Sequence, residues 1–159
     1  MDGSGANAGF LKNSPVEVNE VEAGIRVHSY GLSKDSGGPG KHRGGLGTDF
    51  VFEALSPNTK VTARNRDRTR FAGWVISEGK AGGPSKFIRN PNTEKEFNLR
   101  NTDILSLDPG DTIHVTCGGA GGWGNALDRD PESVLLDAQR NWVSLEQAEK
   151  EYGVVITRN

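Results

Sequence analysis

DSGGPGKHRGGLG, residues 35–47, places six glycines around the basic triplet Lys41, His42 and Arg43. Glycine has no Cβ, so it adopts positive φ at little cost and lets another group approach the backbone closely. The backbone therefore shapes this loop. Two interpretations are open at this point: bare N–H groups and cationic side chains hold an anion, or the glycines only permit a demanding turn between two strands.

A second glycine cluster, GGAGGWG, occupies residues 118–124. Paired glycines indicate positive φ or close backbone approach, so we expect the glycines of both clusters to serve the architecture of their loops. These glycines are Gly37, Gly38, Gly40, Gly44, Gly45, Gly47, Gly118, Gly119, Gly121, Gly122 and Gly124. The basic residues Lys41, His42 and Arg43 are the candidates for anion binding or for anchoring another subunit.

The overall charge excludes a general affinity for polyanions. The chain has 159 residues, with 19 Lys and Arg against 21 Asp and Glu, and a formal net charge of −2. This balance gives no broad attraction to nucleic acid or to an anionic membrane. No apolar run approaches the ~20 residues that a membrane helix needs. We therefore expect neither nucleic acid nor a membrane as a partner.

The start of the chain and its cysteine content favour a cytoplasmic location. The first residues, MDGSGANAGF, have neither the basic start nor the apolar run of a secretory signal. The single cysteine, Cys117, has no second cysteine with which to form an internal disulfide. The chain also has 22 glycines and only 33% hydrophobic residues, which is a small supply of core for an independent fold. We interpret this as a hint of a protein partner.

Short apolar runs separated by turn signals predict a series of antiparallel strands. The predicted strands are residues 15–20, 25–30, 50–55, 60–66, 71–76, 86–89, 96–99, 104–107 and 112–117. The runs at 50–55, 60–66 and 71–76 are typical of a meander, and residues 78–85 of an exposed loop. A hairpin is predicted across Asn90-Pro91-Asn92, and a tight turn at Asp108-Pro109-Gly110-Asp111.

Helix signals occur only near the end of the chain. Asp130 is a good N-cap before Pro131, Ser144 and Gln147 fit a capping box, and Gly153 is placed to end the second helix. The predicted fold is therefore mainly β: a β-barrel or sandwich of short antiparallel strands with a C-terminal pair of short α-helices. We divide the chain into an extended or disordered segment 1–14, a β-rich domain 15–126 and a helical appendage 127–159.

Neither glycine cluster has the pattern of a nucleotide-binding loop. A Walker loop needs a glycine five residues before Gly-Lys and a Ser or Thr after it, but Asp35 and His42 occupy those places. Gly119, Gly121 and Gly124 have dinucleotide spacing, yet the following NALDRDP interrupts the helix that would have to hold the pyrophosphate. We therefore expect no nucleotide cofactor on this chain.

The histidines and the cysteine do not predict a metal site or a nucleophile. The candidates are His28, His42, His114 and Cys117. On a strand over 112–117, His114 and Cys117 would point to opposite faces. Cys117 would share the apolar face of that strand, which predicts a buried, inert thiol. No motif places a nucleophile beside a base.

Four arginines recur at every second position, Arg64, Arg66, Arg68 and Arg70. In a strand they would line one face and offer a surface for phosphate or RNA. Asp67 interrupts the row, and no Trp or Tyr alternates with it as a stacking platform. The favoured interpretation is a solvated edge strand whose charges discourage pairing with another strand edge.

The order of several motifs resembles the C-terminal region of the hydantoinase B / 5-oxoprolinase / acetone carboxylase family. The motifs are NSPVEVNE, DSGGPGKHRGGLG, LDPGDTIHV, the cluster ending in Trp123-Gly124, RDPESVLLD and VSLEQAEKEYGVVI. The similarity covers essentially the whole chain. One departure occurs at residues 72–83, which read AGWVISEGKAGG where the family usually has Pro-Trp-Gly-x-x-Gly-Gly.

The resemblance implies a subunit of an ATP-dependent complex. Family members act with a hydantoinase A-like partner and open cyclic amides such as hydantoin or 5-oxoproline, or carboxylate ketones such as acetone and acetophenone. ATP and a divalent metal are then expected on the partner subunits, with no cofactor and no metal on this chain. The implied partners are a hydantoinase A-like subunit and the missing upstream hydantoinase B-like segment.

The leading hypothesis is a small subunit, the split C-terminal part of such an enzyme, that is inactive in isolation. The catalytic residues stay unassigned. The alternative hypothesis is a stand-alone β-barrel module that binds an anion through Lys41, His42 and Arg43 without catalysis. Under the leading hypothesis, Arg43 anchors its loop to a carboxylate or to the partner subunit, because a guanidinium forms directional hydrogen bonds to acids.

Overall fold

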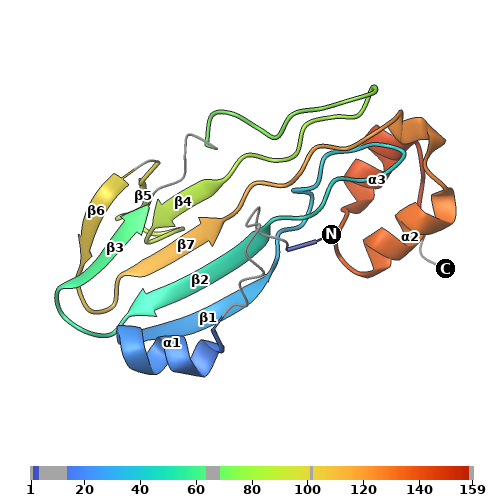
Figure 1. The fold of residues 1–159 in the computed structure, drawn as a ribbon. Coiled ribbons are helices and arrows are strands. Elements are labelled where there is room, and N and C mark those ends of the chain that lie inside the picture. Colours follow the sequence, from blue (N-terminus) through green and yellow to red (C-terminus); the bar gives the residue numbers. More distant parts are fainter. Residues whose placement is uncertain (1, 4–13, 64–68, 101, 158–159) are drawn as a thin grey trace.

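The computed structural model describes residues 2–3, 14–63, 69–100 and 102–157 (Figure 1). The strands are β1 Ile25–Leu32, β2 Thr48–Ala54, β3 Thr59–Ala63, β4 Lys86–Arg89, β5 Phe97–Asn98, β6 Thr102–Leu107 and β7 Thr112–Thr116. The helices are α1 Val16–Ala23, the 3₁₀ turn η1 Ala126–Asp128, α2 Pro131–Gln139 and α3 Leu145–Tyr152. The prediction of a mainly β fold with two short helices at its C-terminal end is confirmed.

The strands form two antiparallel sheets. One has five strands in the order β1-β2-β7-β4-β5, and the other pairs β3 with β6. In the part of the chain that the structure describes, the larger sheet is open, with β1 and β5 at its edges. Of the two predicted architectures, the barrel is therefore not formed, and the two sheets are arranged like a sandwich.

The main hydrophobic core lies between the two sheets. Phe52, Ile113 and Phe87 are buried members from β2, β7 and β4, and Leu107 enters from β6. Val61 of β3 packs against the same cluster. Side chains from both sheets thus fill one apolar layer, as expected where alternate residues of each strand point inward.

The prediction of a strand over residues 15–20 is wrong, because this segment forms α1. The helix begins after Pro15 and ends at Gly24, whose φ of 61° is left-handed. No residue of α1 is buried, and Val21 is 85% exposed. The alternating valines therefore do not mark a buried face. Local capping by a proline at the start and a glycine at the end decides the structure.

The predicted meander over residues 50–76 is also wrong. β2 pairs with β1 and β7, β3 pairs with β6, and residues 71–76 form a loop with one isolated bridge from Ile76 to Trp123. In the β2–β7 register, Phe52 lies opposite Ile113. Tertiary burial of these apolar faces selects β7 as the neighbour, although it is distant in sequence.

Several local predictions are confirmed. The predicted β4–β5 hairpin forms, with residues 90–96 between its strands, and the Asp111 N–H donates to the Asp108 carbonyl at 3.0 Å in the predicted turn. Asp130 caps α2 ahead of Pro131. The Ser144 hydroxyl accepts the Gln147 N–H, and α3 ends at a left-handed glycine. Each of these signals acts over a few residues, which explains why sequence alone was sufficient.

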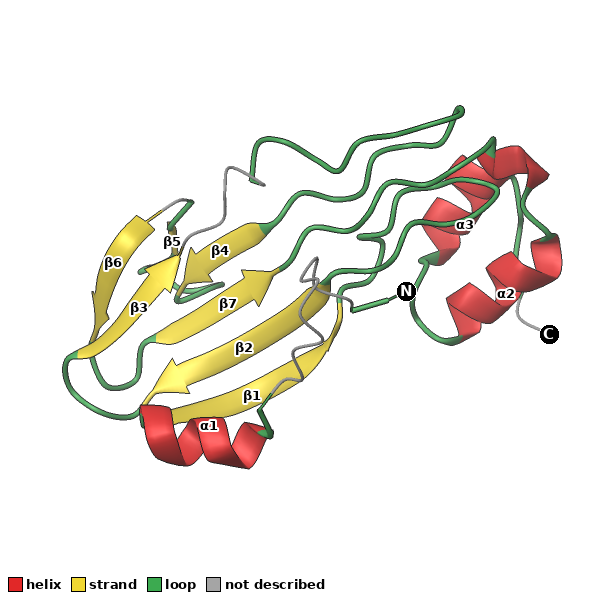
Figure 2. Cartoon of the chain, in the orientation of Figure 1, coloured by secondary structure: helices red, strands yellow, loops and turns green. Residues whose placement is uncertain are grey.

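The sheets and the C-terminal helices lie at opposite ends of the molecule, with long loops between them (Figure 2). α2 and α3 have a small core of their own, which contains Val134, Val143 and Tyr152. Most of the segment 1–14, predicted to be extended or disordered, lies outside the described residues. No helix in the described part of the chain is long and apolar enough to span a membrane.

Candidate functional site

Three glycine-containing loops connect the two ends of the molecule and form the candidate site. They are the first glycine loop, residues 33–47, the second, residues 71–85, and the third, residues 117–125. The first joins β1 to β2, the second leads into β4, and the third leaves β7. Figure 2 draws them as extended, roughly parallel segments, and hydrogen bonds tie each one to the other two. We call this assembly the glycine-loop bundle.

Backbone hydrogen bonds run around the bundle in a closed order. The Gly38 N–H of the first loop donates to the Ala120 carbonyl of the third at 2.9 Å. The Gly122 N–H of the third donates to the Lys80 carbonyl of the second at 2.9 Å. The Lys80 N–H donates in turn to the Pro39 carbonyl of the first at 2.8 Å. The bundle is therefore held by main-chain groups and not by side-chain packing.

The backbones approach so closely that side chains have no room. A Cβ at Gly119 would lie 1.8 Å from the Ser36 carbonyl oxygen, and one at Gly44 would lie 2.0 Å from the Ala120 carbonyl oxygen. A Cβ at Gly122 would lie 2.1 Å from the Pro39 carbonyl oxygen. The hydrogen that replaces Cβ thus points at a neighbouring carbonyl, as in weak Cα–H···O contacts. Collagen uses glycine at its crowded axis for the same reason.

The glycines of the two clusters serve close approach far more than left-handed turns. Of the eleven glycines named from the sequence, only Gly124 has a positive φ, 76°. In the first loop the left-handed residue is Asp35, with φ of 59°. Gly45 has no positive φ, and its carbonyl accepts the Ala120 N–H at 2.9 Å. A valine at Gly45 would therefore not be forced into a left-handed backbone conformation, a possibility that the sequence alone did not exclude.

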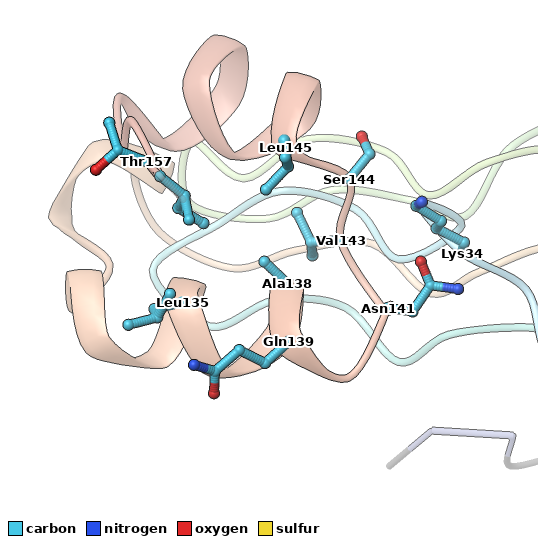
Figure 3. Close-up of a pocket in the computed structure, with 10 residues that line it drawn as sticks. Lys34, Leu135, Ala138, Gln139, Asn141, Val143, Ser144, Leu145 and Thr157 are labelled. Atoms are coloured by element: carbon cyan, nitrogen blue, oxygen red, sulfur yellow. The ribbon is translucent and has the colours of Figure 1, made fainter. Parts of the chain in front are cut away.

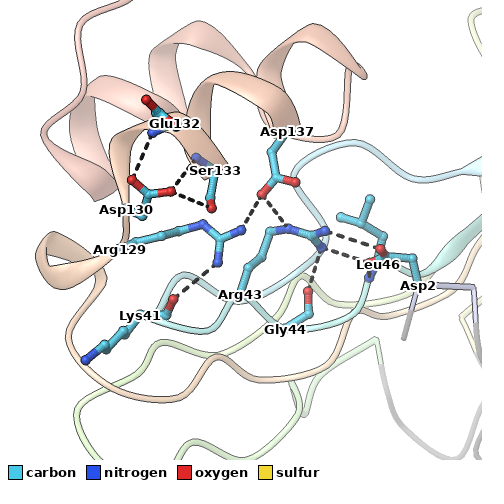
Figure 4. Close-up of polar contacts among 10 residues, drawn as sticks. All are labelled: Asp2, Lys41, Arg43, Gly44, Leu46, Arg129, Asp130, Glu132, Ser133 and Asp137. Carbon is cyan, nitrogen blue, oxygen red and sulfur yellow. Dashed lines mark hydrogen bonds and ion pairs between the residues drawn. The ribbon is translucent and has the colours of Figure 1, made fainter.

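An ion network fixes the first glycine loop to α2 and to the start of the chain (Figure 4). Arg43 Nε donates to Asp137 Oδ2 at 3.0 Å, and Arg43 Nη1 donates to Asp2 Oδ1 at 2.9 Å. Arg129 Nη2 donates to the same Asp137 Oδ2 at 2.8 Å, and its Nη1 to the Lys41 carbonyl at 3.2 Å. The side chains of Arg43 and Asp137 are only 8% and 7% exposed. Two guanidiniums and two carboxylates balance one another in this network.

The network shifts the pKa values of two of its members, Arg43 and Asp2. Burial alone would lower the pKa of the Arg43 guanidinium, but its hydrogen bonds to Asp2 and Asp137 leave that pKa raised. The hydrogen bond from Arg43 is the main reason why the pKa of the Asp2 carboxyl lies below its usual range. Arg43 and Asp2 are therefore ionised at neutral pH and hold each other as paired charges.

The three basic residues named from the sequence divide into two groups. Arg43 points inward and is occupied by carboxylates, whereas Lys41 and His42 are exposed. The His42 ring lies 5.4 Å from the Trp123 ring. The structure thus does not bring the three cations together around one cavity. A role of Lys41 and His42 in contacting an anion or another subunit stays a prediction.

Two histidine–carboxylate pairs lie on the larger sheet, but neither is a catalytic triad. His114 Nε2 lies 2.8 Å from Asp49 Oδ1, and the Thr116 hydroxyl lies 3.4 Å from the same nitrogen. A triad needs the acid and the nucleophile on opposite ring nitrogens. His28 Nε2 pairs with Glu53 at 3.1 Å, on a largely exposed part of the sheet. These pairs fit interactions between neighbouring strands.

Cys117 is exposed, so the prediction of a buried thiol is wrong. β7 ends at Thr116, and the strand alternation that would have turned Cys117 inward ends with it. Within the described residues, no group of three or more His, Cys, Asp and Glu side chains could hold a metal ion. Arg64, Arg66 and Arg68 of the arginine row lie outside the described residues.

A groove of about 510 Å³ lies beside α2 and the start of α3 (Figure 3). Apolar side chains such as Leu135, Val143 and Leu145 line it together with Lys34 and Ser144. The Ser144 hydroxyl is occupied as the cap of α3 and the Ser144 N–H donates to Asp35. These contacts are structural, and we assign no chemistry to the groove.

The sequence did not indicate one of the three loops of the bundle or most of the ion network. Gly79 and Gly82 of the second loop are packed as tightly as the named glycines, with Cβ positions 2.1 and 2.4 Å from carbonyl oxygens of the third loop. The prediction of an exposed loop over 78–85 is wrong for Gly82 and Ser85, which are buried. The feature of the sequence that could have indicated the second loop is its glycine content, which it shares with the other two loops. Nothing in the sequence pointed to Asp137 as the partner of Arg43.

Comparisons with known proteins identify the family. Residues 1–126 match Hydantoinase B/oxoprolinase, so the chain belongs to this family. The beta subunit of caprolactamase from Pseudomonas jessenii is 33% identical over 157 residues, which cover 95% of this chain and 26% of that protein. A protein of Pseudomonas sp. strain NS671, named as the B component of a D-/L-hydantoinase, is 33% identical over 152 residues, covering 92% of this chain and 25% of its own length.

Two solved structures share the fold. The crystal structure of ATP-dependent caprolactamase from Pseudomonas jessenii superposes with a TM-score of 0.73 and 28% identity, covering 90% of this chain and 25% of that chain. A nucleotide-free acetone carboxylase structure gives a TM-score of 0.77 at 19% identity, covering 92% and 24%, and shows the fold alone. The present chain therefore spans about a quarter of the length of these relatives.

Proposed function

We propose that this chain is the C-terminal part of a hydantoinase B-like subunit in an ATP-dependent complex that opens cyclic amides. The observation that carries the proposal is identity along nearly the whole chain with two relatives named for cyclic amides. The caprolactamase beta subunit and the hydantoinase B component are each 33% identical over more than 90% of this chain.

In this proposal the chain supports a site and does not carry the reaction. Its most extensive feature is the glycine-loop bundle, whose backbones pack with carbonyl oxygens against glycine Cα atoms. The buried ion pair of Arg43 with Asp137 locks that bundle to α2. Such a scaffold can serve as a rigid support for neighbouring catalytic residues, because the geometry of a functional site is kept by rigid elements.

The other parts of the reaction belong to partners. We place ATP and a divalent metal on other subunits, because the described residues offer neither a phosphate loop nor a cluster of metal ligands. The expected partners are a hydantoinase A-like subunit and the upstream hydantoinase B-like segment. Carboxylation of a ketone is the second candidate reaction, and 29% identity over 155 residues with the delta subunit of acetophenone carboxylase from Aromatoleum aromaticum supports it.

The ion network favours a role in an enzyme complex over a stand-alone anion-binding module. That module would need Arg43 to face a ligand, but Asp2 and Asp137 occupy the Arg43 guanidinium. Of the three basic residues 41–43, only Lys41 and His42 remain exposed. A buried arginine that already has two carboxylate partners has little capacity left for a further anion.

A chimeric enzyme tests the proposal. The matched quarter of the P. jessenii caprolactamase beta subunit is replaced by this chain, and the chimera is produced with the other subunits of that enzyme. We expect ATP-dependent opening of caprolactam above the rate of a truncated blank that lacks the quarter. An assembled chimera no faster than the blank would contradict cyclic-amide opening.

The isolated chain should neither hydrolyse ATP nor open hydantoins, so turnover by it alone would place catalytic residues within this chain.

A further inference from the structure

The second and third glycine loops carry five exposed large apolar side chains. We call Phe71, Trp74, Val75, Ile76 and Trp123 the Trp74 patch. The exposed fractions are 94% for Trp74, 70% for Ile76 and 50% for Trp123. The chain has few hydrophobic residues, yet it leaves Trp74 almost wholly and Trp123 half exposed to water.

Backbone contacts between the second and third glycine loops support the patch. Ile76 and Trp123 form a backbone bridge between the second and third glycine loops. The Trp74 carbonyl lies 2.2 Å from the position that a Cβ on Gly121 would take, so these two backbones also touch. The bundle therefore presents the tryptophans from packed main chain, which limits the conformational entropy lost when they bind a partner.

The size of the patch fits the apolar centre of a protein interface. Large aromatic side chains each offer about 150–250 Å² on burial, so the patch amounts to roughly 500 Å². Monomeric proteins seldom leave a larger apolar patch in water unless it is functional. A stable interface buries about 800 Å² on each side, with aromatic residues at its centre and polar residues at its rim.

The rim of the patch is mostly basic. Lys41 lies next to Gly124, and no described residue pairs with its ammonium group. His42 stacks against Trp123, and the Arg70 guanidinium lies 5.5 Å from the centre of the Phe71 ring. Glu78 is the one exposed carboxylate in the adjoining turn at residues 77–78. A matching surface is therefore apolar at its centre and acidic at its edge.

We propose that the Trp74 patch is the surface on which this chain docks to the remaining three quarters of a hydantoinase B-like chain. This inference rests on the proposed function. In the caprolactamase structure the same fold accounts for 25% of a longer chain, so some face of the fold adjoins the rest of that polypeptide. The family match over residues 1–126 includes the whole Trp74 patch. The occupant of the patch is thus the upstream hydantoinase B-like segment, with apolar and acidic side chains facing the tryptophans.

Co-expression tests this docking surface. The probe is the beta subunit of P. jessenii caprolactamase without its matched quarter, carrying an affinity tag and produced together with this chain. The wild-type chain is expected to co-purify in a 1:1 complex. Trp74→Ser combined with Ile76→Ser should weaken the complex at least tenfold, and Lys41→Glu about threefold with a stronger effect at low salt.

The matched control is Val21→Ser combined with Val155→Ser, two apolar residues on α1 and near the C-terminus that are 85% and 68% exposed. It should leave the affinity within twofold of wild type. All variants alter exposed side chains, so their thermal melts should match that of the wild type. Quenching of tryptophan fluorescence by acrylamide should also decrease when the complex forms, because Trp74 loses its contact with water.

The outcomes separate this inference from the proposed function. A wild-type complex that the Trp74 and Ile76 substitutions do not weaken would overturn the docking surface and leave the proposed function standing. Absence of any complex with the wild-type chain would overturn both. A symmetric dimer of this chain that the same substitutions dissociate would assign the patch to a second copy, and would also overturn the inference.

Discussion

The two ends of the β-rich region are held together in opposite ways. Between the sheets, large side chains such as Ile113 and Phe52 fill an apolar layer. In the glycine-loop bundle, main chains meet directly, and a Cβ at Gly119 would lie 1.8 Å from a neighbouring carbonyl oxygen. The first arrangement depends on the volume of side chains, and the second depends on their absence.

This difference explains the unusual composition. A hydrophobic content of 33% suggests too small a core if every part of the chain is assumed to be held by apolar packing. The bundle replaces apolar packing by hydrogen bonds between loops and by one buried ion network. The low hydrophobic content is therefore a property of the bundle and is not in itself evidence of a partner. The proposed partner rests on relatives that are named as subunits and on the exposed Trp74 patch.

The largest expected effect is on the bundle. Gly119→Val should lower the free energy of unfolding by about 4 kcal/mol or more, because backbone atoms cannot move aside as a flexible side chain could. Gly31→Ala is the control, since no atom lies within 4 Å of its Cβ position and its φ is not positive. Urea titrations of both variants measure the effect. Equal stability of the two variants would mean that the backbones of the bundle can move apart at little cost in free energy.

The sheet core should respond to lost volume. Ile113→Ala removes a fully buried side chain and should cost about 3 kcal/mol, from lost burial and from the cavity left behind. Ile104→Ala, at a position that is 65% exposed, should cost less than about 0.5 kcal/mol. Urea titration again provides the measurement. A small effect at Ile113 would show that the layer between the sheets is loosely packed.

The ion network should have an intermediate effect. Asp137→Asn keeps the shape of the side chain but removes the charge that faces Arg43 and Arg129, and should cost about 2 kcal/mol. The control is Glu146→Gln, an exposed carboxylate on α3, which should be neutral within about 0.5 kcal/mol. Hydrogen exchange of the first glycine loop should accelerate only in the Asp137 variant. Unchanged exchange would contradict a locking role for the network.

The smallest effect concerns acid. Because the pKa of Asp2 is lowered in the folded chain, its pairing with Arg43 stabilises the protein fully above the ordinary carboxyl pKa. This stabilisation is lost as the pH falls through the lowered pKa, since the unfolded chain takes up the proton first. Asp2→Asn should cost about 1 kcal/mol at pH 7 and approach the wild type in strongly acidic solution. Melting temperatures between pH 7 and pH 2 test this, and a constant difference across the range would exclude the pairing.

The sequence by itself determined the features that depend on a few neighbouring residues. The turn at residues 108–111, the caps at Asp130 and Ser144 and the left-handed glycine after α3 follow from local hydrogen bonds and allowed φ angles. The ordered motifs also indicated the family, which the match over residues 1–126 confirms. The glycine clusters predicted loops that are shaped by their backbone. They did not indicate whether the glycines serve positive φ angles or close approach of another backbone.

Only the tertiary structure decided which distant segments meet. It joined β2 to β7, gathered three glycine loops into one bundle and paired Arg43 with Asp137. It also separated Arg43 from Lys41 and His42, which adjoin it in sequence but face solvent. These choices depend on burial and charge neutralisation between groups tens of residues apart. The local preferences of a segment do not identify such partners, because each of these interactions forms only when the chain folds.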